Sequence, residues 1–127
     1  MDQPIPVRSQ LNPGDCWAVE DIFPTEEAWA QALEACKDLP QEIAAYKGRL
    51  GESAQTLLRY LSRMEAVNRQ VEKIFVYAFL RLDEDTADST HRAMKGRCFS
   101  FVVQLQSAAS FEGPELVAIP DETLDAW

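Results

Sequence analysis

The chain has 127 residues, the length of one domain, and its apolar content of 46% is typical of a globular protein. Its net charge of −9 and isoelectric point near 4.5 argue against nucleic acid and anionic membrane surfaces as partners, because both attract lysine and arginine. The longest apolar run lies within 74–80, far shorter than the ~20 residues that a membrane-spanning helix needs.

The first part of the chain, 1–24, is predicted to be an extended arm. Residues 1–15 are polar and rich in proline, with no helical periodicity and no likeness to a signal peptide. We expect four apolar residues near the end of this segment to hold it against the rest of the domain. They are Trp17, Val19, Ile22 and Phe23.

The three cysteines are widely spaced along the chain, at Cys16, Cys36 and Cys98. An odd number of cysteines without a Cys-x-x-Cys pair is typical of reduced thiols, and not of a disulfide framework or a zinc site. Since no signal peptide precedes them, we expect a cytoplasmic location.

A first helix is predicted to begin after Thr25, which can serve as an N-cap and is followed by two glutamates in the first turn. Pro40 lacks a backbone donor, so the helix either kinks there or ends and restarts with Pro40 in its first turn. Gly48 is predicted to end it in a left-handed C-cap with Leu50 packed against it. The apolar stripe of this region is Trp29, Leu33, Cys36 and Leu39.

The longest predicted helix begins at Ser62 and is the centre of the fold. Ser53 is a plausible cap for a short amphipathic segment before it, and Ser62 with Glu65 has the form of a capping box that restarts the helix. Apolar residues recur at steps of three and four through 71–82 and cover most of the circumference, so we expect burial on several sides. The helix should run about 22 residues, on the order of 33 Å.

Asp88 is predicted to cap a fourth helix after a brief connection, so the two long helices must be antiparallel neighbours. Gly113 and Pro114 are expected to end this fourth helix, and a fifth is expected to begin near Asp121. Because that last helix has no C-cap before Trp127, we expect the chain to be a fragment of a longer protein. The predicted fold is therefore all-α, an antiparallel bundle of four to five helices built around a long helical hairpin at about 62–111.

Four segments carry a family resemblance. They read EDIFPTEEAW at 20–29, YKGRL at 46–50, YAFLRLDEDT at 77–86 and PELVAIP at 114–120. In this order they resemble the N-terminal region of bacterial oligoendopeptidase F, a member of the thimet oligopeptidase family of zinc metallopeptidases. The sequence departs from the family after Trp17, because Ala18 and Val19 follow where the family commonly has Asp and Leu.

The resemblance implies the N-terminal helical domain of a zinc metallo-oligoendopeptidase, with an arm at 1–24 and a helical domain at 25–127 that is truncated before the catalytic domain. In that family this domain helps to wall the cavity in which short peptides are hydrolysed. The implied partners are the catalytic domain of the same chain, which holds the zinc, and short peptides. The four segments carry no catalytic residues in that family, so we expect neither catalysis nor a cofactor in this segment.

His91, the single histidine, fits this expectation. The family binds zinc through a His-Glu-x-x-His helix, whereas the fourth residue after His91 is Lys95. A catalytic zinc needs three protein ligands, so we reject zinc binding here and interpret His91 as solvated or next to a helix cap. A cysteine nucleophile would need His91 as its base, and we interpret Cys36 and Cys98 as core residues instead.

An acidic turn, made of Asp83, Glu84, Asp85 and Asp88, follows the central helix. It admits three interpretations. The first is a solvated turn, and the second is ion pairing with Arg81, Arg92 or an arginine elsewhere in a parent protein. The third is a calcium loop. For a calcium loop, the sequence of the turn lacks the twelve-residue spacing and the central glycine of an EF-hand.

Four residues are candidates for contacts with a peptide channel or a neighbouring domain: Tyr77, Arg81, Asp83 and Asp85. The alternative for the first two is a buried tyrosine and an arginine at the domain edge.

A free-standing helical interaction module is the alternative function. The helix at 71–82 has more apolar surface than three short neighbours can cover. We therefore expect the isolated chain to form homo-oligomers through its uncovered face.

Overall fold

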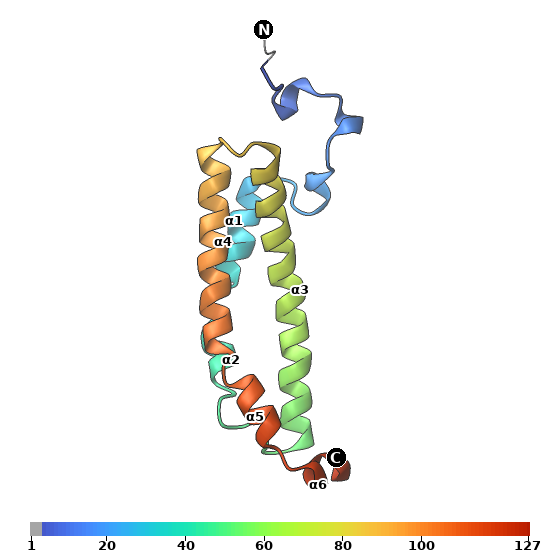
Figure 1. Ribbon diagram of the computed structural model, residues 1–127, viewed down its shortest axis with the longest axis vertical. Coiled ribbons are helices and arrows are strands. Elements are labelled where there is room, and N and C mark those ends of the chain that lie inside the picture. Colours follow the sequence, from blue (N-terminus) through green and yellow to red (C-terminus); the bar gives the residue numbers. More distant parts are fainter. Residues whose placement is uncertain (1–3) are drawn as a thin grey trace.

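Two long antiparallel helices form the body of the molecule, and two short helices cover one side of them (Figure 1). The computed structural model describes residues 4–127, so the first three residues of the predicted arm lie outside the described range. Every regular element within that range is a helix, which confirms the predicted all-α class. The α-helices are α1 Glu26–Ala35, α2 Leu39–Ala44, α3 Ala54–Glu84, α4 Ser89–Ala108, α5 Glu112–Ala118 and α6 Asp121–Ala126.

The central helix α3 is one continuous element of 31 residues, about 46 Å long. It begins after Ser53, whose Oγ accepts a hydrogen bond from the backbone N–H of Thr56 over 3.1 Å. The predicted restart at Ser62 is wrong, because Ser62 is an exposed residue inside the helix. The residues between Ala54 and Ser62 include no glycine or proline, so nothing interrupts the helix and no second cap is needed.

The α3–α4 hairpin confirms the predicted pairing of long helices, with its first helix starting earlier than predicted. Asp88 caps α4 through its Oδ1, which accepts from the backbone N–H groups of Thr90 over 2.8 Å and His91 over 3.0 Å. The predicted stop at Gly113 and Pro114 is wrong, because α4 already ends at Ala108. Both residues lie in the first turn of α5, where the N–H that proline lacks would have no intrahelical partner.

Pro40 lies in the first turn of a new helix and does not kink a continuous one. α1 ends at Ala35, and α2 begins at Leu39 with Pro40 in its first turn. Thr25 caps α1 as predicted, since its Oγ1 accepts from the backbone N–H of Ala28 over 3.0 Å. Gly48 has a φ of 80°, the left-handed conformation that the sequence predicts there, but it does not cap the helix, because α2 already ends at Ala44 and a turn lies between them.

The core lies between the hairpin and the layer formed by α1 and α2. α1 packs on α3, and α2 packs on both long helices. Trp29 is 1% exposed and donates its indole N–H to the backbone carbonyl of Ile74 over 2.8 Å, which fixes α1 on α3. At the other end of the hairpin, the Tyr60 ring packs on Tyr46 and Phe111 with centroid distances of 5.3 and 5.7 Å.

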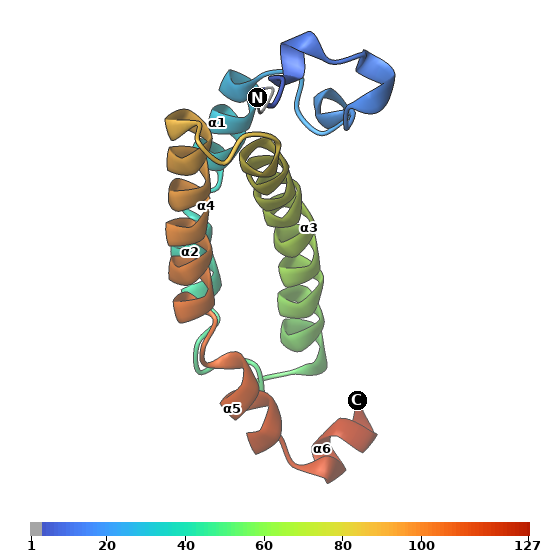
Figure 2. The ribbon, with the colours of Figure 1, turned by 45° about the horizontal axis from the view of Figure 1, so that its top comes forward.

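The N-terminal segment forms a loop beyond the α1 end of the hairpin (Figure 2). It contains three single-turn 3-10 helices, Arg8–Gln10, Pro13–Asp15 and Val19–Asp21. Val19 is buried, and Ile22 and Phe23 pack against the core as expected, whereas Trp17 is 53% exposed and does not hold the segment in place. The division of the chain at residue 24 stays a prediction.

Candidate functional site

The four predicted contact residues lie near the turn between α3 and α4, but they do not form one cluster. Tyr77 is buried with its ring edge-on to Phe23, and burial raises the pKa of its hydroxyl although Arg81 opposes this shift. Asp83 is exposed, and the Oδ1 of Asp85 accepts the backbone N–H of Ala87 over 3.0 Å. A role for these residues in a channel or an interdomain contact stays a prediction.

Arg81 is the centre of a charged network that joins distant segments of the chain. Its guanidinium donates to Glu26 of α1 and to Glu84 of α3, both over 3.1 Å. Glu84 also pairs with Arg8, which pairs in turn with Glu20 over 2.8 Å. The sequence analysis missed Arg8, Glu20 and Glu26, because Arg8 is 76 residues from Glu84 and no local pattern marks such a pair.

His91 belongs to the same network. It is buried, so the interpretation of a solvated side chain is wrong, whereas its place beside the Asp88 cap is confirmed. Its Nε2 lies 2.9 Å from the Glu26 carboxylate and 3.2 Å from the Arg81 guanidinium, and because a carboxylate only accepts, Nε2 carries the proton that is donated to Glu26. Burial of Glu26 works against its charge, yet the hydrogen bonds from His91 and Arg81 hold the pKa of Glu26 below its ordinary value.

Two residues of the acidic turn bind other groups of the same chain. Glu84 pairs with arginines, as the second interpretation predicts, while Asp88 caps α4 and its backbone hydrogen bond from His91 holds the pKa of its carboxyl below the ordinary value. Arg92 donates to the backbone carbonyl of Thr86 over 2.9 Å and not to an acid. Across residues 4–127 no three side chains of the types His, Cys, Asp and Glu come together as a possible metal site.

The two core cysteines have the surroundings of unreactive thiols. Both are fully buried. Burial raises the pKa of the Cys98 thiol to about 11 and raises that of Cys36 as well. A thiol that stays protonated near neutral pH is a poor nucleophile, which favours the interpretation of Cys36 and Cys98 as core residues.

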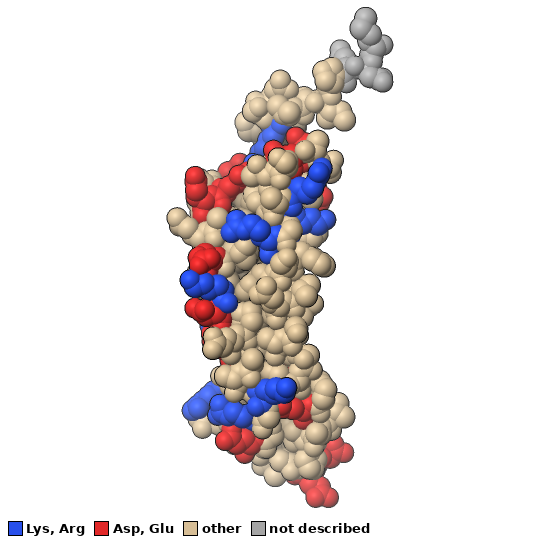
Figure 3. Space-filling model, turned by 90° about the vertical axis from the view of Figure 1, so that its left-hand side faces the viewer, with Lys and Arg blue, Asp and Glu red and all other residues tan. Residues whose placement is uncertain are grey.

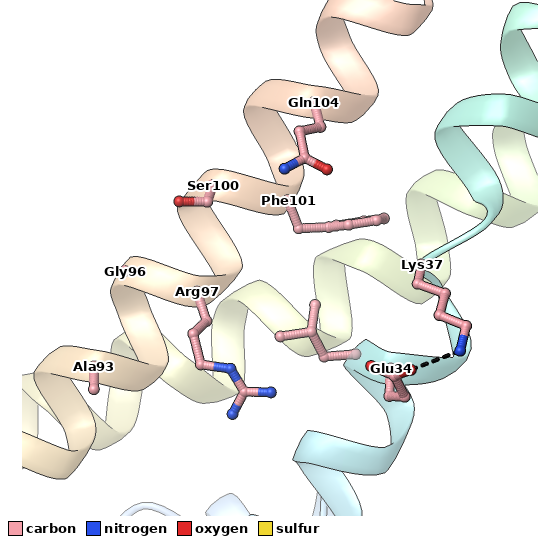
Figure 4. Close-up of a pocket in the computed structure, with 9 residues that line it drawn as sticks. Glu34, Lys37, Ala93, Gly96, Arg97, Ser100, Phe101 and Gln104 are labelled. Atoms are coloured by element: carbon pink, nitrogen blue, oxygen red, sulfur yellow. Dashed lines mark hydrogen bonds and ion pairs between the residues drawn. The ribbon is translucent and has the colours of Figure 1, made fainter.

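A groove of about 580 Å³ lies between α1 and α4 (Figure 4). Leu33 and the buried Phe101 give it an apolar floor, and Ala93 and Gly96 leave little side-chain volume on its α4 side. Its rim is polar. On the α1 side Lys37 pairs with Glu34 over 2.8 Å, and the α4 side carries Arg97, Ser100 and Gln104.

Arg97 is held at this rim by an aromatic ring. The carbon of its guanidinium lies 5.4 Å from the ring centroid of Trp29, the residue that fixes α1 on α3. Among the described residues no carboxylate forms an ion pair with Arg97. The hydrogen bond from Lys37, with a smaller effect of Arg97, holds the pKa of Glu34 below its ordinary value. The sequence analysis missed this site, because it depends on how α1 and α4 lie in space.

The other flank of α4 contributes to an uncovered apolar surface on the hairpin. We define this open face by Leu61, Phe75 and Phe79 of α3 together with Phe99 and Val103 of α4. The rings of Phe75 and Phe79 stack at 4.0 Å, and the Lys95 ammonium lies 4.4 Å from the Phe79 centroid, which places the two stripes side by side. Phe99 is 56% exposed and Val103 is 48% exposed.

The α4 side of this surface carries few charges, with Lys95 beside Phe79 at one end. No charged residue occurs between Arg97 and Glu112. Figure 3 shows the result on the α4 side of the molecule, where a band without Lys, Arg, Asp or Glu runs between charged groups at the two ends. None of the described helices is long and apolar enough to cross a membrane.

Comparison with known proteins gives relatives of one kind. No family model matches the chain, and no solved structure matches it. The chain is 32% identical over 123 residues to the oligopeptidase PepF of Bacillus subtilis (strain 168), a match that covers 97% of this chain and 18% of the relative. It is 29% identical over 122 residues to the chromosomal oligoendopeptidase F of Lactococcus lactis subsp. cremoris, covering 94% of this chain and 20% of the relative.

A third relative is more distant. The group B oligopeptidase PepB of Streptococcus agalactiae serotype III (strain NEM316) is 24% identical over 120 residues, with 94% of this chain and 20% of the relative covered. The chain therefore spans about a fifth of the length of these relatives, and the resemblance predicted from its four segments is confirmed as similarity to a segment of oligoendopeptidase F.

Proposed function

We propose that this chain, which is similar to a segment of oligoendopeptidase F, is the N-terminal, non-catalytic helical domain of a zinc metallo-oligoendopeptidase. Its role is to wall the cavity in which the parent enzyme hydrolyses short peptides. The zinc and the residues that activate water belong to a catalytic domain of the same parent, and the parent works in the cytoplasm.

The observation that carries this proposal is the open face. An apolar surface that follows two long helices, with few charges along its α4 side, is typical of a surface that another protein element covers. The relatives are about five times longer than this chain and so have ample sequence to cover it. The open face is therefore the surface against which the rest of the parent packs.

The chemistry of the described residues favours a structural role over a catalytic role in hydrolysis. A catalytic zinc needs three protein ligands, and the single histidine already donates to Glu26 inside the charged network. The buried thiols lack the lowered pKa of a cysteine nucleophile. This chain forms a wall of the peptide cavity, and the Trp29 hydrogen bond and the caps of the two long helices hold that wall in place.

A chimera tests the proposal. This chain replaces the matched segment of the Bacillus subtilis relative, and hydrolysis of a short quenched fluorescent peptide is measured together with zinc content. We expect the chimera to cleave the peptide. Phe99→Glu in the open face should abolish cleavage by preventing the two parts from packing, whereas Val117→Glu on α5, which is 87% exposed, should leave it intact.

The alternative function, a free-standing helical interaction module, predicts other results. Either a chimera that binds zinc but cannot cleave the peptide, or an active chimera that Phe99→Glu impairs no more than Val117→Glu does, would contradict the peptidase proposal. The open face would then be a binding surface for a separate protein.

A further inference from the structure

We propose that the groove between α1 and α4 binds an acidic peptide segment, with the Arg97 guanidinium receiving a carboxylate of that segment. The groove lies on the flank of α4 that faces α1, whereas Phe99 of the open face lies on its other flank, as does Lys95, which contacts Phe79. The inference therefore does not depend on the peptidase proposal, and the two are tested by different residues.

The position of Arg97 is fixed before any ligand arrives. Its guanidinium lies over Trp29, whose ring is 1% exposed and anchored by the hydrogen bond to Ile74. The N–H groups of a guanidinium lie in its own plane, so a guanidinium that rests on an aromatic face can still bind a carboxylate at its edge through two parallel hydrogen bonds. Because Arg97 forms no ion pair within residues 4–127, a ligand carboxylate would not have to displace one.

The groups around Arg97 select an anionic ligand. Among the residues that line the groove, Lys37 pairs with Glu34 and Arg97 forms no ion pair, while Glu26 and Glu27 line a neighbouring pocket that Arg97 also lines. Ser100 and Gln104 add side-chain donors on the α4 side (Figure 4).

The shape of the groove favours a peptide over a small inorganic anion. The lining residues run from Ala93 to Gln104 along α4, about 16 Å of helix. The floor of Leu33 and Phe101 offers apolar contact along this length, while the cation stands at the rim. A segment with a carboxylate and neighbouring apolar side chains matches both features.

Titration of the folded 127-residue chain with defined peptides tests the proposal. The probe is a capped, alanine-based peptide with glutamates and leucines one helical turn apart, and its partner has glutamine in place of each glutamate. Binding is followed through the backbone amide signals of Arg97, Ser100 and Gln104 in nuclear magnetic resonance spectra. We expect the glutamate peptide to bind at least tenfold more tightly than the glutamine peptide.

Three variants identify the site. Arg97→Gln should weaken binding of the glutamate peptide about tenfold or more, whereas Arg59→Gln, an equal charge change at an exposed residue of α3, should leave it within about twofold. Gly96→Leu should block the groove with Arg97 intact, and it should fold because no atom lies within 4 Å of a Cβ added at Gly96.

Two results would overturn the proposal. One is equal affinity for the glutamate and glutamine peptides, including no binding of either. The other is binding that survives both Arg97→Gln and Gly96→Leu in folded protein, because the peptide would then be held elsewhere. Cleavage by the chimera is measured separately and does not enter either result.

Discussion

Glu84 shows how a single carboxylate connects segments that are far apart in the sequence. It accepts from Arg81 on its own helix and from Arg8 in the N-terminal segment, and its side chain is only 12% exposed. A paired charge at such depth is stabilising only while its partners remain, since removing one partner leaves the other charge poorly solvated. We therefore expect the network to matter more to stability than the exposed ion pairs of this chain.

A glutamine substitution measures this difference. Glu84→Gln should lower the free energy of unfolding by about 1–3 kcal/mol, because two guanidinium groups lose a charged acceptor. The matched control is Glu65→Gln, which removes an exposed pair with Arg69 and should cost less than about 0.5 kcal/mol. Urea unfolding at neutral pH gives both values. Equal losses would show that the network contributes no more to the free energy of unfolding than an exposed ion pair.

Glu26 gives a prediction about pH. The pKa of its carboxyl is lower in the folded chain than the ordinary value of about 4.3, so its contribution to stability is complete above that pH and is lost as pH falls through the folded pKa. We expect the urea midpoint to decline below about pH 4.3, and to decline less steeply in Glu26→Gln. Identical pH profiles for the two proteins would contradict the assignment of hydrogen bonds to Glu26.

At the scale of helices, the local signals in the sequence predict the helix caps but not the hydrogen bonds between helices that are far apart in the sequence. Thr25 and Asp88 cap helices where the sequence predicts them, because a cap depends on neighbours within one turn, whereas Gly48 has the predicted left-handed conformation but lies beyond the end of α2. The Tyr60 hydroxyl donates to Glu112 over 2.6 Å, and Glu115 accepts the backbone N–H of Leu50 over 3.2 Å. These contacts join α5 to residues more than fifty positions earlier, and no periodicity in the sequence reveals them.

The start of α3 can be tested with two serines. Ser53→Ala should cost about 0.5–2 kcal/mol, because the backbone N–H of Thr56 loses its acceptor. Ser62→Ala should be neutral or stabilise by up to about 0.5 kcal/mol, because alanine is the better helix former at an exposed position. Thermal or urea unfolding distinguishes them, and a larger loss for Ser62→Ala would mean that the capping box operates after all.

At the scale of the whole molecule, the hairpin is covered on one side only. α1 and α2 occupy one side, and the open face remains on the other (Figures 1 and 2). Its helices could be predicted from the apolar spacing, but which flank of each helix stays uncovered depends on where the short helices pack. The groove at Arg97 escaped prediction for the same reason.

The open face should make the isolated chain self-associate. We expect light scattering to give a mass above the 14.3 kDa of one chain, rising with concentration, because burying the exposed phenylalanine and valine side chains of α4 is favourable. The double variant Phe99→Glu, Val103→Glu should restore a monomer without unfolding. A clean monomer of the wild-type chain at high concentration would contradict this expectation.

The measurement that tests the central claim most directly is the coding sequence downstream of Trp127. The proposed function predicts an open reading frame that continues into a helix with the pattern His-Glu-x-x-His, which needs two histidines where this sequence has one. The open face would then be the surface on which that continuation packs. A stop codon directly after Trp127 would contradict the account, and the helical interaction module would take its place.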